Sequence, residues 1–158
     1  MRVPLYRQLE SSDCGPACIR MVSAYYGKAY RMKTLKALCH LTRIGISIRD
    51  VVGCCEAIGF EAACVNLGRT EVRRMPLPAI LYLRHGHFVV LEKVRAGRSG
   101  TLYTLLDPAY GRVCLPEEKL AEKWLVAGKG VAVVMSPKPD FRKINPEREG
   151  EERRGGMA

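Results

Sequence analysis

The stretch RQLESSDCGPACIRMVSAYYG, residues 7–27, contains a cysteine directly after Ser-Asp and directly before Gly-Pro. Apolar side chains then recur every three or four residues up to the helix stop signal Gly27: Cys14, Cys18, Met21, Val22 and Tyr25. This spacing predicts a helix over residues 14–26. With Asp13 as its N-cap, Cys14 lies in the first turn, where Pro16 is tolerated because the amide groups there have no helical partner.

Cys14 occupies an unusual position for a thiol, because it lies at the positive end of the helix dipole. That position stabilises a thiolate and lowers the pKa of a cysteine. Gly15 also leaves the adjacent backbone open to the close approach of another molecule. We therefore interpret Cys14 as a reactive thiol and the other six cysteines as thiols of the core: Cys18, Cys39, Cys54, Cys55, Cys64 and Cys114.

The composition indicates one domain in a reducing compartment. A chain of 158 residues with 47% hydrophobic content can form one ordinary core. The N-terminus MRVPLYRQLE lacks the apolar run of an export signal, and no window of about 20 apolar residues could span a bilayer. Seven cysteines without an export signal are typical of reduced thiols. We therefore expect a soluble, cytoplasmic chain.

Neither a metal nor a cofactor is expected. Zinc is disfavoured because no C-x-x-C pair occurs, and CGPAC is one residue longer than the redox motif C-G-P-C. The formal net charge of +10 favours acidic peptides, anionic lipid surfaces or nucleic acid as partners. No nucleic-acid motif is present, and the charges are scattered without interleaved aromatic residues, so we expect no nucleic-acid partner.

The order of the predicted elements is typical of an α+β fold, because helices fill the first half of the chain and strands the second. Apolar spacing predicts two more helices, over residues 32–42 and 48–58, the latter capped by Ser47 with Asp50 three residues on. A short helix should begin at Pro116. Six β-rich runs predict an antiparallel sheet: residues 62–67, 78–83, 87–94, 101–106, 111–115 and 130–135.

The pattern of apolar residues fails after residue 136. Beyond it the sequence is rich in proline, glycine and charge, and Phe141 and Ile144 are its only large apolar residues. We interpret residues 1–136 as the domain and residues 137–158 as a polar linker or disordered tail.

A thiolate nucleophile needs an imidazole beside it, and the candidates are His40, His85 and His87. His40 falls on a predicted helix with no acidic residue nearby in the sequence. One predicted strand begins at His87, and the next one ends beside Asp107. The two are joined by RAGRSG, which predicts a hairpin loop centred near residues 97 and 98.

Pairing about this centre makes residue numbers across the ladder sum to about 195. His87 then lies opposite Asp107 or its neighbour, whereas His85 faces Ala109. An aspartate that holds the imidazole in the right tautomer completes a set of nucleophile, base and orienting acid. We therefore predict that Cys14, His87 and Asp107 form one catalytic site.

Three blocks of the sequence, in order, resemble the bacterial double-glycine leader peptidases. These are papain-like cysteine peptidases found mostly as the N-terminal domain of peptidase-containing ABC transporters. The blocks are QLESSDCGPACIRMVSAYYG, LPAILYLRHGHFVVLEKV and LLDPAYGRVCL, and the resemblance covers residues 4–135. Tyr82 and Leu83 stand where members of the family often have a His-Trp-like pair.

The resemblance implies a papain-like fold with N-terminal helices packed on a C-terminal antiparallel sheet. It also implies the roles of four catalytic residues: Cys14 as nucleophile, His87 as general base, Asp107 as orienting acid and Gln8 as oxyanion-hole donor. The sequence assigns no residue to the leader-binding groove.

The implied activity is cleavage of a leader peptide after Gly-Gly at the cytoplasmic face of the bacterial inner membrane, coupled to export of a bacteriocin, lanthipeptide or similar peptide. The implied partners are a precursor with an amphipathic leader and a transporter region with an ATP-binding part, in the same chain or separate. Two alternatives stay open. One is a docking module that binds leader or partner peptides without cleaving them, and the other is a papain-like deamidase or acyltransferase.

Overall fold

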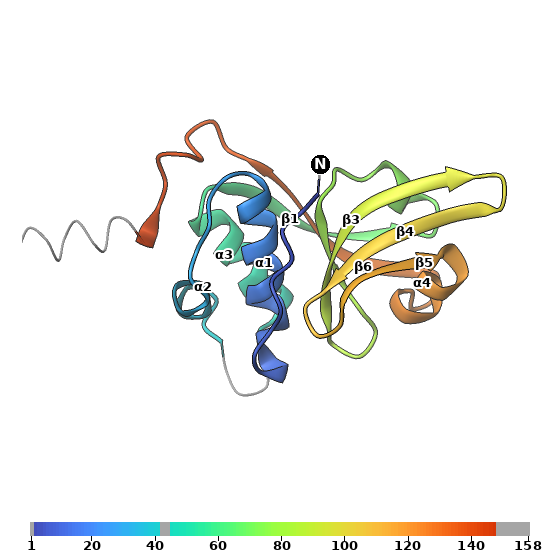
Figure 1. The fold of residues 1–158 in the computed structure, drawn as a ribbon, viewed down its shortest axis with the longest axis horizontal. Coiled ribbons are helices and arrows are strands. Elements are labelled where there is room, and N and C mark those ends of the chain that lie inside the picture. The colour runs from blue at the N-terminus through green and yellow to red at the C-terminus, as the bar shows by residue number, and fades with distance from the viewer. Residues whose placement is uncertain (1, 42–44, 148–158) are drawn as a thin grey trace, which may run out of the picture.

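Three helices from the first half of the chain lie on one side of a six-stranded antiparallel sheet formed by the second half (Figure 1). The computed structural model describes residues 2–41 and 45–147. The predicted α+β class, with helices packed on an antiparallel sheet, is confirmed. In the part of the chain so described, no helix combines the length and the apolar character that crossing a membrane requires.

The helices are α1 (Cys14–Tyr25), α2 (Met32–Leu38), α3 (Ile48–Ala57) and α4 (Glu117–Trp124). The predicted cap of α3 is confirmed, since the Ser47 hydroxyl accepts a hydrogen bond of 3.1 Å from the Asp50 amide. The helix predicted over residues 32–42 is shorter. It ends at Leu38, and His40 follows it in a left-handed conformation (φ 53°), so this histidine lies outside the helix.

All six predicted strands are present: β1 (Phe60–Gly68), β2 (Ala79–Tyr82), β3 (Phe88–Gly97), β4 (Gly100–Asp107), β5 (Gly111–Pro116) and β6 (Lys129–Pro137). Their order in the sheet is β1-β6-β2-β3-β4-β5. The last strand therefore lies between the first two, and β1 and β5 form the edges.

Both faces of the sheet are covered. Successive residues of a strand point to opposite faces, so one strand contributes side chains to two cores. In β3, Phe88 and Val90 join the core beneath α1 and α3, whereas Val89 and Leu91 join a second core. Leu120 and Trp124 of α4, together with a 3-10 turn at Glu71–Arg74, cover that second face. Strand β2 is therefore apolar throughout, and β3 is buried and apolar over its first four residues, next to the site described below.

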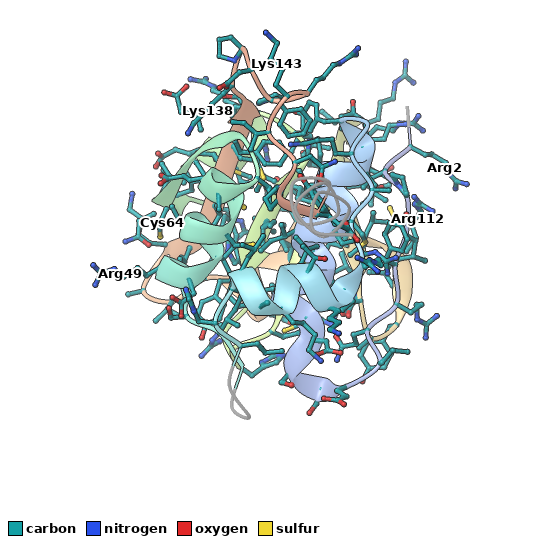
Figure 2. The ribbon with its side chains drawn as sticks, turned by 90° about the vertical axis from the view of Figure 1, so that its left-hand side faces the viewer. Arg2, Arg49, Cys64, Arg112, Lys138 and Lys143 are labelled. Atoms are coloured by element: carbon teal, nitrogen blue, oxygen red, sulfur yellow. The ribbon has the colours of Figure 1, made fainter. Side chains whose placement is uncertain are left out.

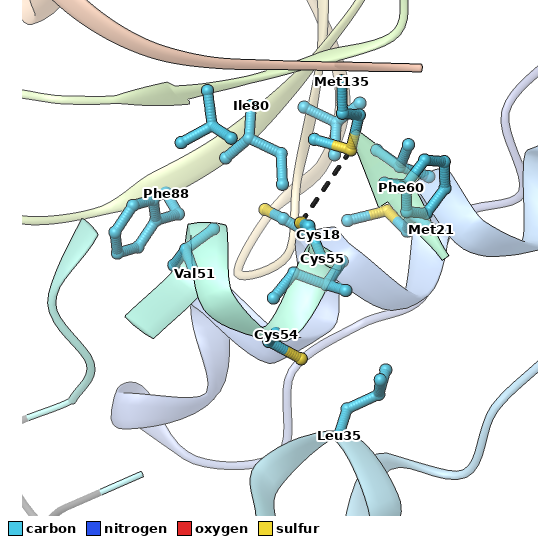
Figure 3. Packing of buried hydrophobic residues seen from close by; sticks show 14 of the residues in the cluster. Cys18, Met21, Leu35, Val51, Cys54, Cys55, Phe60, Ile80, Phe88 and Met135 are labelled. Atoms are coloured by element: carbon cyan, nitrogen blue, oxygen red, sulfur yellow. Dashed lines mark hydrogen bonds between the residues drawn. The ribbon is translucent and has the colours of Figure 1, made fainter. Parts of the chain in front are cut away.

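The cysteines divide into two groups, which corrects the prediction that six of them are core thiols. Four are buried beside α1 and α3, and Figure 3 shows three of them, with the Cys55 sulfur 4.0 Å from that of Met135: Cys18, Cys39, Cys54 and Cys55. Cys64 and Cys114 are exposed instead. They lie on the edge strands β1 and β5, which have one neighbour each, and Figure 2 shows Cys64 at the outer rim of the molecule.

Residues 138–147 pack on the domain, although the sequence pattern assigns them to a linker or tail. Phe141 is only 4% exposed and lies in the main core, with its ring centroid 4.8 Å from that of Phe60. The Lys28 ammonium, below that ring, donates a hydrogen bond of 2.5 Å to the Ile144 carbonyl. A buried aromatic side chain and a hydrogen bond from Lys28 thus hold this polar segment against the domain. The rest of the predicted tail, 148–158, lies outside the described residues.

Candidate active site

Cys14 is the first residue of α1 and is 7% exposed. Helix α1 packs on β3, so its first turn faces the start of that strand. Three groups lie close enough to the sulfur to favour its charged form: the His87 ring and the backbone amides of Phe88 and Gly15. His87 could be predicted from the sequence, because a thiolate nucleophile needs an imidazole beside it. Phe88 gave no such signal, because it contributes a backbone amide that any residue except proline could supply.

The imidazole of His87 lies between Cys14 and a carboxylate. Its Nε2 atom is 2.7 Å from Asp107 Oδ1, and that oxygen also accepts a hydrogen bond of 2.8 Å from the Ala109 amide. Both side chains are largely buried. With Nε2 held by Asp107, Nδ1 is the ring nitrogen available to the Cys14 sulfur. The predicted meeting of Cys14, His87 and Asp107 is therefore present in the structure.

The route by which His87 meets Asp107 differs from the predicted register. The hairpin pairs Gly97 with Gly100, so its centre lies one residue further along the chain than expected. A bulge then shifts the ladder, which ends at the pair Val90 and Leu106. His87 and Asp107 lie just beyond this last pair and meet through their side chains. His85 does not face Ala109 as expected, but is exposed in the turn before β3.

The electrostatics of the pair favour an ionised thiol. Burial raises the pKa of the Cys14 thiol, but the hydrogen bond from His87, the amides of Phe88 and Gly15 and the positive charge of the ring outweigh it, so the pKa is lower than the usual value. The hydrogen bond to Asp107, and next the one to Cys14, raises the pKa of His87 to about 9. Both shifts favour the pair of a thiolate and an imidazolium over the neutral pair.

Asp13 is the N-cap residue of α1, as predicted, but its carboxylate accepts no hydrogen bond from the helix. The side chain is buried, forms an ion pair of 3.1 Å with Lys36 and accepts a hydrogen bond of 3.2 Å from the Glu10 amide. Because the residue next to the thiol is acidic, Lys36 offsets a charge that would otherwise oppose thiolate formation. No local sequence pattern indicates this ion pair, which joins α2 to the residue before α1.

Gly15 has a different role from the predicted one. A side chain at this position would begin 2.6 Å from Ile46 Cδ1 and 3.5 Å from a carbon of the Phe88 ring. The space beside its backbone is thus filled by the chain's own apolar residues rather than left open to another molecule. Ile46 and Phe88 thereby form an apolar wall next to the residue that follows Cys14. Tyr82, one of the two departures from the family pattern, packs on Phe88 at a ring distance of 4.7 Å.

Gln8 lies beside the turn that follows Asp107. Its backbone amide donates a hydrogen bond of 2.8 Å to the Pro108 carbonyl, and its side-chain Nε2 donates one of 3.0 Å to the Glu10 carbonyl. A primary amide nitrogen carries two hydrogens, so the second is free of this bond. Among the described residues, the Gln8 Oε1 atom is buried and has no hydrogen-bond partner.

Two curated relatives come from Escherichia coli. The probable microcin-H47 secretion/processing ATP-binding protein MchF is 31% identical over 140 residues, and the colicin V secretion/processing ATP-binding protein CvaB is 30% identical over 141 residues. Each match covers 89% of this chain and 19% of the relative. The chain thus spans about a fifth of the length of these relatives.

Two solved structures share the fold. One is a double glycine motif protease from an AMS/PCAT transporter in complex with the leader peptide, with a TM-score of 0.78 and 27% identity over 87% of this chain and 93% of that one. The other is the peptidase domain of Streptococcus ComA, with a TM-score of 0.74 and 19% identity over 87% of this chain and 100% of that one. Together they confirm the predicted fold class.

The family assignment rests on the length of the match. The model of the peptidase C39 family matches residues 2–140, which include the three blocks that carry the resemblance and every residue of the site described above. Because this match spans far more than half of the chain, the chain belongs to the peptidase C39 family.

Proposed function

We propose that this chain is a cysteine peptidase that cleaves leader peptides after a Gly-Gly motif. One observation carries the proposal: His87 joins the Cys14 thiol, at the start of α1, to Asp107 at 2.7 Å. This is the arrangement that nucleophilic acyl transfer requires. The family and the likeness to a double glycine motif protease support the choice of substrate.

The reaction follows from the positions of these groups. The Cys14 thiolate attacks the carbonyl carbon of the second glycine, and the His87 imidazolium gives its proton to the nitrogen of the leaving peptide. An acyl-enzyme remains, with the leader held as a thioester. Neutral His87 then takes a proton from water, which attacks the thioester and releases the leader with a free carboxylate. Asp107 keeps the ring oriented throughout.

The oxyanion formed in each step needs hydrogen-bond donors already in place. The backbone amide of Cys14 supplies one, because it lies at the start of α1, where helix amides have no internal partner. The Gln8 side chain supplies the second through the hydrogen that does not bind Glu10. A neutral amide suits this role, since it stabilises the oxyanion without pairing with the thiolate.

Replacing Gln8 by alanine should therefore lower kcat by about 10²–10³, or roughly 2.7–4 kcal/mol, with little change in KM. Gln8→Glu should be at least as damaging, because it places a negative charge where one develops. Steady-state kinetics of both variants on one leader peptide test this. Turnover near that of the wild type for either variant would remove Gln8 from the mechanism.

The pH dependence of kcat/KM should be bell-shaped. Activity requires the imidazolium, which the raised pKa of His87 maintains up to about pH 9, and it requires the thiolate, which is lost in acid. Since the hydrogen bond to Asp107 is the main cause of the raised pKa, Asp107→Asn should move the alkaline limb to lower pH. An alkaline limb that stays in place in Asp107→Asn would contradict this assignment.

Thiol reagents should inactivate the protein, whereas chelators should not. Cys64 and Cys114 are exposed and will also react with iodoacetamide, so the informative protein is the Cys64→Ser, Cys114→Ser double variant. It should keep wild-type activity and lose it to iodoacetamide as fast as the wild type does. Activity lost to EDTA and restored by zinc or calcium would contradict the proposal.

We further propose that the chain works next to a transporter region, at the cytoplasmic face of the membrane. The two Escherichia coli relatives are secretion/processing ATP-binding proteins, and this chain matches about a fifth of the length of each. A transporter beside the peptidase would remove the released peptide as it forms. The precursor would be a bacteriocin-type or lanthipeptide-type peptide with an amphipathic leader, and the net charge of +10 suits an acidic one.

Mass spectrometry of a Gly-Gly leader peptide after incubation with the chain tests the proposal against its two alternatives. The peptidase predicts two fragments that separate after the second glycine. Binding without cleavage would instead assign a docking module, and transfer of the leader to an added amine without hydrolysis would assign an acyltransferase. The contact of Cys14 with His87 favours the peptidase over the docking module, which has no use for an ionised thiol.

A further inference from the structure

Two large apolar side chains remain in solvent next to the proposed catalytic residues. Leu9 is 90% exposed and directly follows Gln8, and Tyr110 is 79% exposed and lies three residues after Asp107. Within the described part of the chain, the other exposed large apolar side chains are Leu102 at 43% and Val126 at 61%, so Leu9 and Tyr110 are the most exposed of this set. Exposed apolar side chains that are held beside a reaction site are candidates for contact with the substrate.

Backbone and side-chain hydrogen bonds hold the two segments together. The Gln8 amide donates to the Pro108 carbonyl at 2.8 Å, and the Arg7 guanidinium donates to the Ala109 carbonyl at 3.0 Å. In Figure 1 the turn between β4 and β5 accordingly lies beside the N-terminal segment that leads into α1. Leu9 and Tyr110 therefore project from neighbouring segments.

The turn that carries Tyr110 is itself fixed. The Tyr110 amide donates a hydrogen bond of 3.2 Å to the Asp107 carbonyl, and the Ala109 amide donates one of 2.8 Å to the Asp107 carboxylate. Asp107, which orients His87, thus also holds the backbone of the turn that carries Tyr110. A ligand that binds there would meet a backbone already in place, which lowers the entropic cost of binding.

The chemistry of the reaction indicates which part of the substrate passes here. His87 must deliver its proton to the nitrogen of the leaving peptide, so the residues that follow the cut leave past the imidazole. Asp107 approaches that imidazole from the same turn as Tyr110. Gln8, which precedes Leu9, faces the carbonyl at the cut in the mechanism proposed above. The two apolar side chains therefore lie on the path of the released peptide rather than on that of the leader.

We propose that Leu9 and Tyr110 form a binding site for the first two residues of the released peptide, and that the chain prefers precursors with an apolar or aromatic side chain there. This inference rests on the proposed function. This site selects among precursors by the first two residues of the released peptide, independently of the leader sequence.

Two precursor peptides with one leader test it, the first with Leu-Phe and the second with Ser-Ser directly after Gly-Gly. The wild type should cleave the Leu-Phe peptide with a kcat/KM about tenfold higher than that of the Ser-Ser peptide. In the Leu9→Ser, Tyr110→Ser double variant this ratio should fall to about one, since both side chains are replaced. The matched control is the Leu102→Ser, Val126→Ser variant, which removes two exposed apolar side chains elsewhere and should keep the ratio.

The outcomes separate this contact from the proposed function. Cleavage of both peptides at equal rates by the wild type, or a preference that survives in the Leu9→Ser, Tyr110→Ser variant, would overturn the contact and leave the peptidase intact. Self-association of the wild type that this variant abolishes, without change in the ratio, would assign the surface to a second copy of the chain and also overturn it. No cleavage of either peptide would overturn the proposed function and the contact with it.

Discussion

Replacing Cys14 by alanine is expected to abolish cleavage of a Gly-Gly leader peptide, with a loss of at least about 10⁴-fold in kcat. The variant has no nucleophile, and neither His87 nor the oxyanion donors can replace it. The change removes one largely buried sulfur atom from the first turn of α1, so the fold and the affinity for the leader should persist. Single-turnover cleavage and titration of leader binding measure the two effects separately.

Cys18 provides the matched control on the same helix. It lies one turn after Cys14 and is fully buried, and burial raises its pKa well above that of a free thiol, so it is neutral. Cys18→Ala should therefore lower stability through the cavity that it leaves, while cleavage continues. A folded Cys18→Ala variant as inactive as Cys14→Ala would contradict the assignment of Cys14 as the essential thiol.

His87→Ala should be the second nearly inactive variant, again with a loss of about 10⁴-fold or more in kcat. It removes both the hydrogen bond that favours the Cys14 thiolate and the acid that protonates the leaving peptide. Reaction of Cys14 with iodoacetamide at neutral pH should slow in the same variant, because the pKa of the thiol rises. Cleavage kinetics and alkylation rates report these two losses independently.

His85 is the control for this prediction, since it lies two residues earlier and is exposed in the turn before β3. His85→Ala should cleave at close to the wild-type rate. A larger loss in His85→Ala than in His87→Ala would show that the wrong histidine has been placed beside Cys14.

The class of the fold could be predicted from the sequence because its signals are local. Helix α3 is an example, since Ser47, Asp50 and the apolar spacing after them mark its start without help from the rest of the chain. The order of the strands could not be predicted in this way. Strand β6 lies between β1 and β2, a pairing of segments far apart in the sequence that no pattern within β6 indicates.

The contact of His87 with Asp107 was predicted, but by an approximate argument. The hairpin and its polar ends were visible in the sequence, whereas the bulge between Leu91 and Lys93 was not. The ladder therefore differs from the predicted one, and the two side chains meet beyond its last pair. Side-chain chemistry was a better guide to this pair than the register was.

Predictions that depended on long-range packing were the least accurate. Asp13 has the right chemistry for a cap but pairs with Lys36 from another helix. Gly15 is explained by Ile46, which is more than 30 residues away in the sequence. Phe141 fills a space in the core that a polar sequence context does not reveal. In each case the partner that decides the role is distant in the chain.

The most direct test of the central claim is to trap Cys14 with the substrate's own recognition elements. A leader peptide that ends in a Gly-Gly chloromethyl ketone places an electrophile next to the carbonyl that the thiolate attacks. Mass spectrometry of the digested protein should find the leader attached to the peptide that contains Cys14, and no adduct in His87→Ala over the same time. Attachment to the exposed Cys64 or Cys114, or no adduct at all in the wild type, would contradict the account.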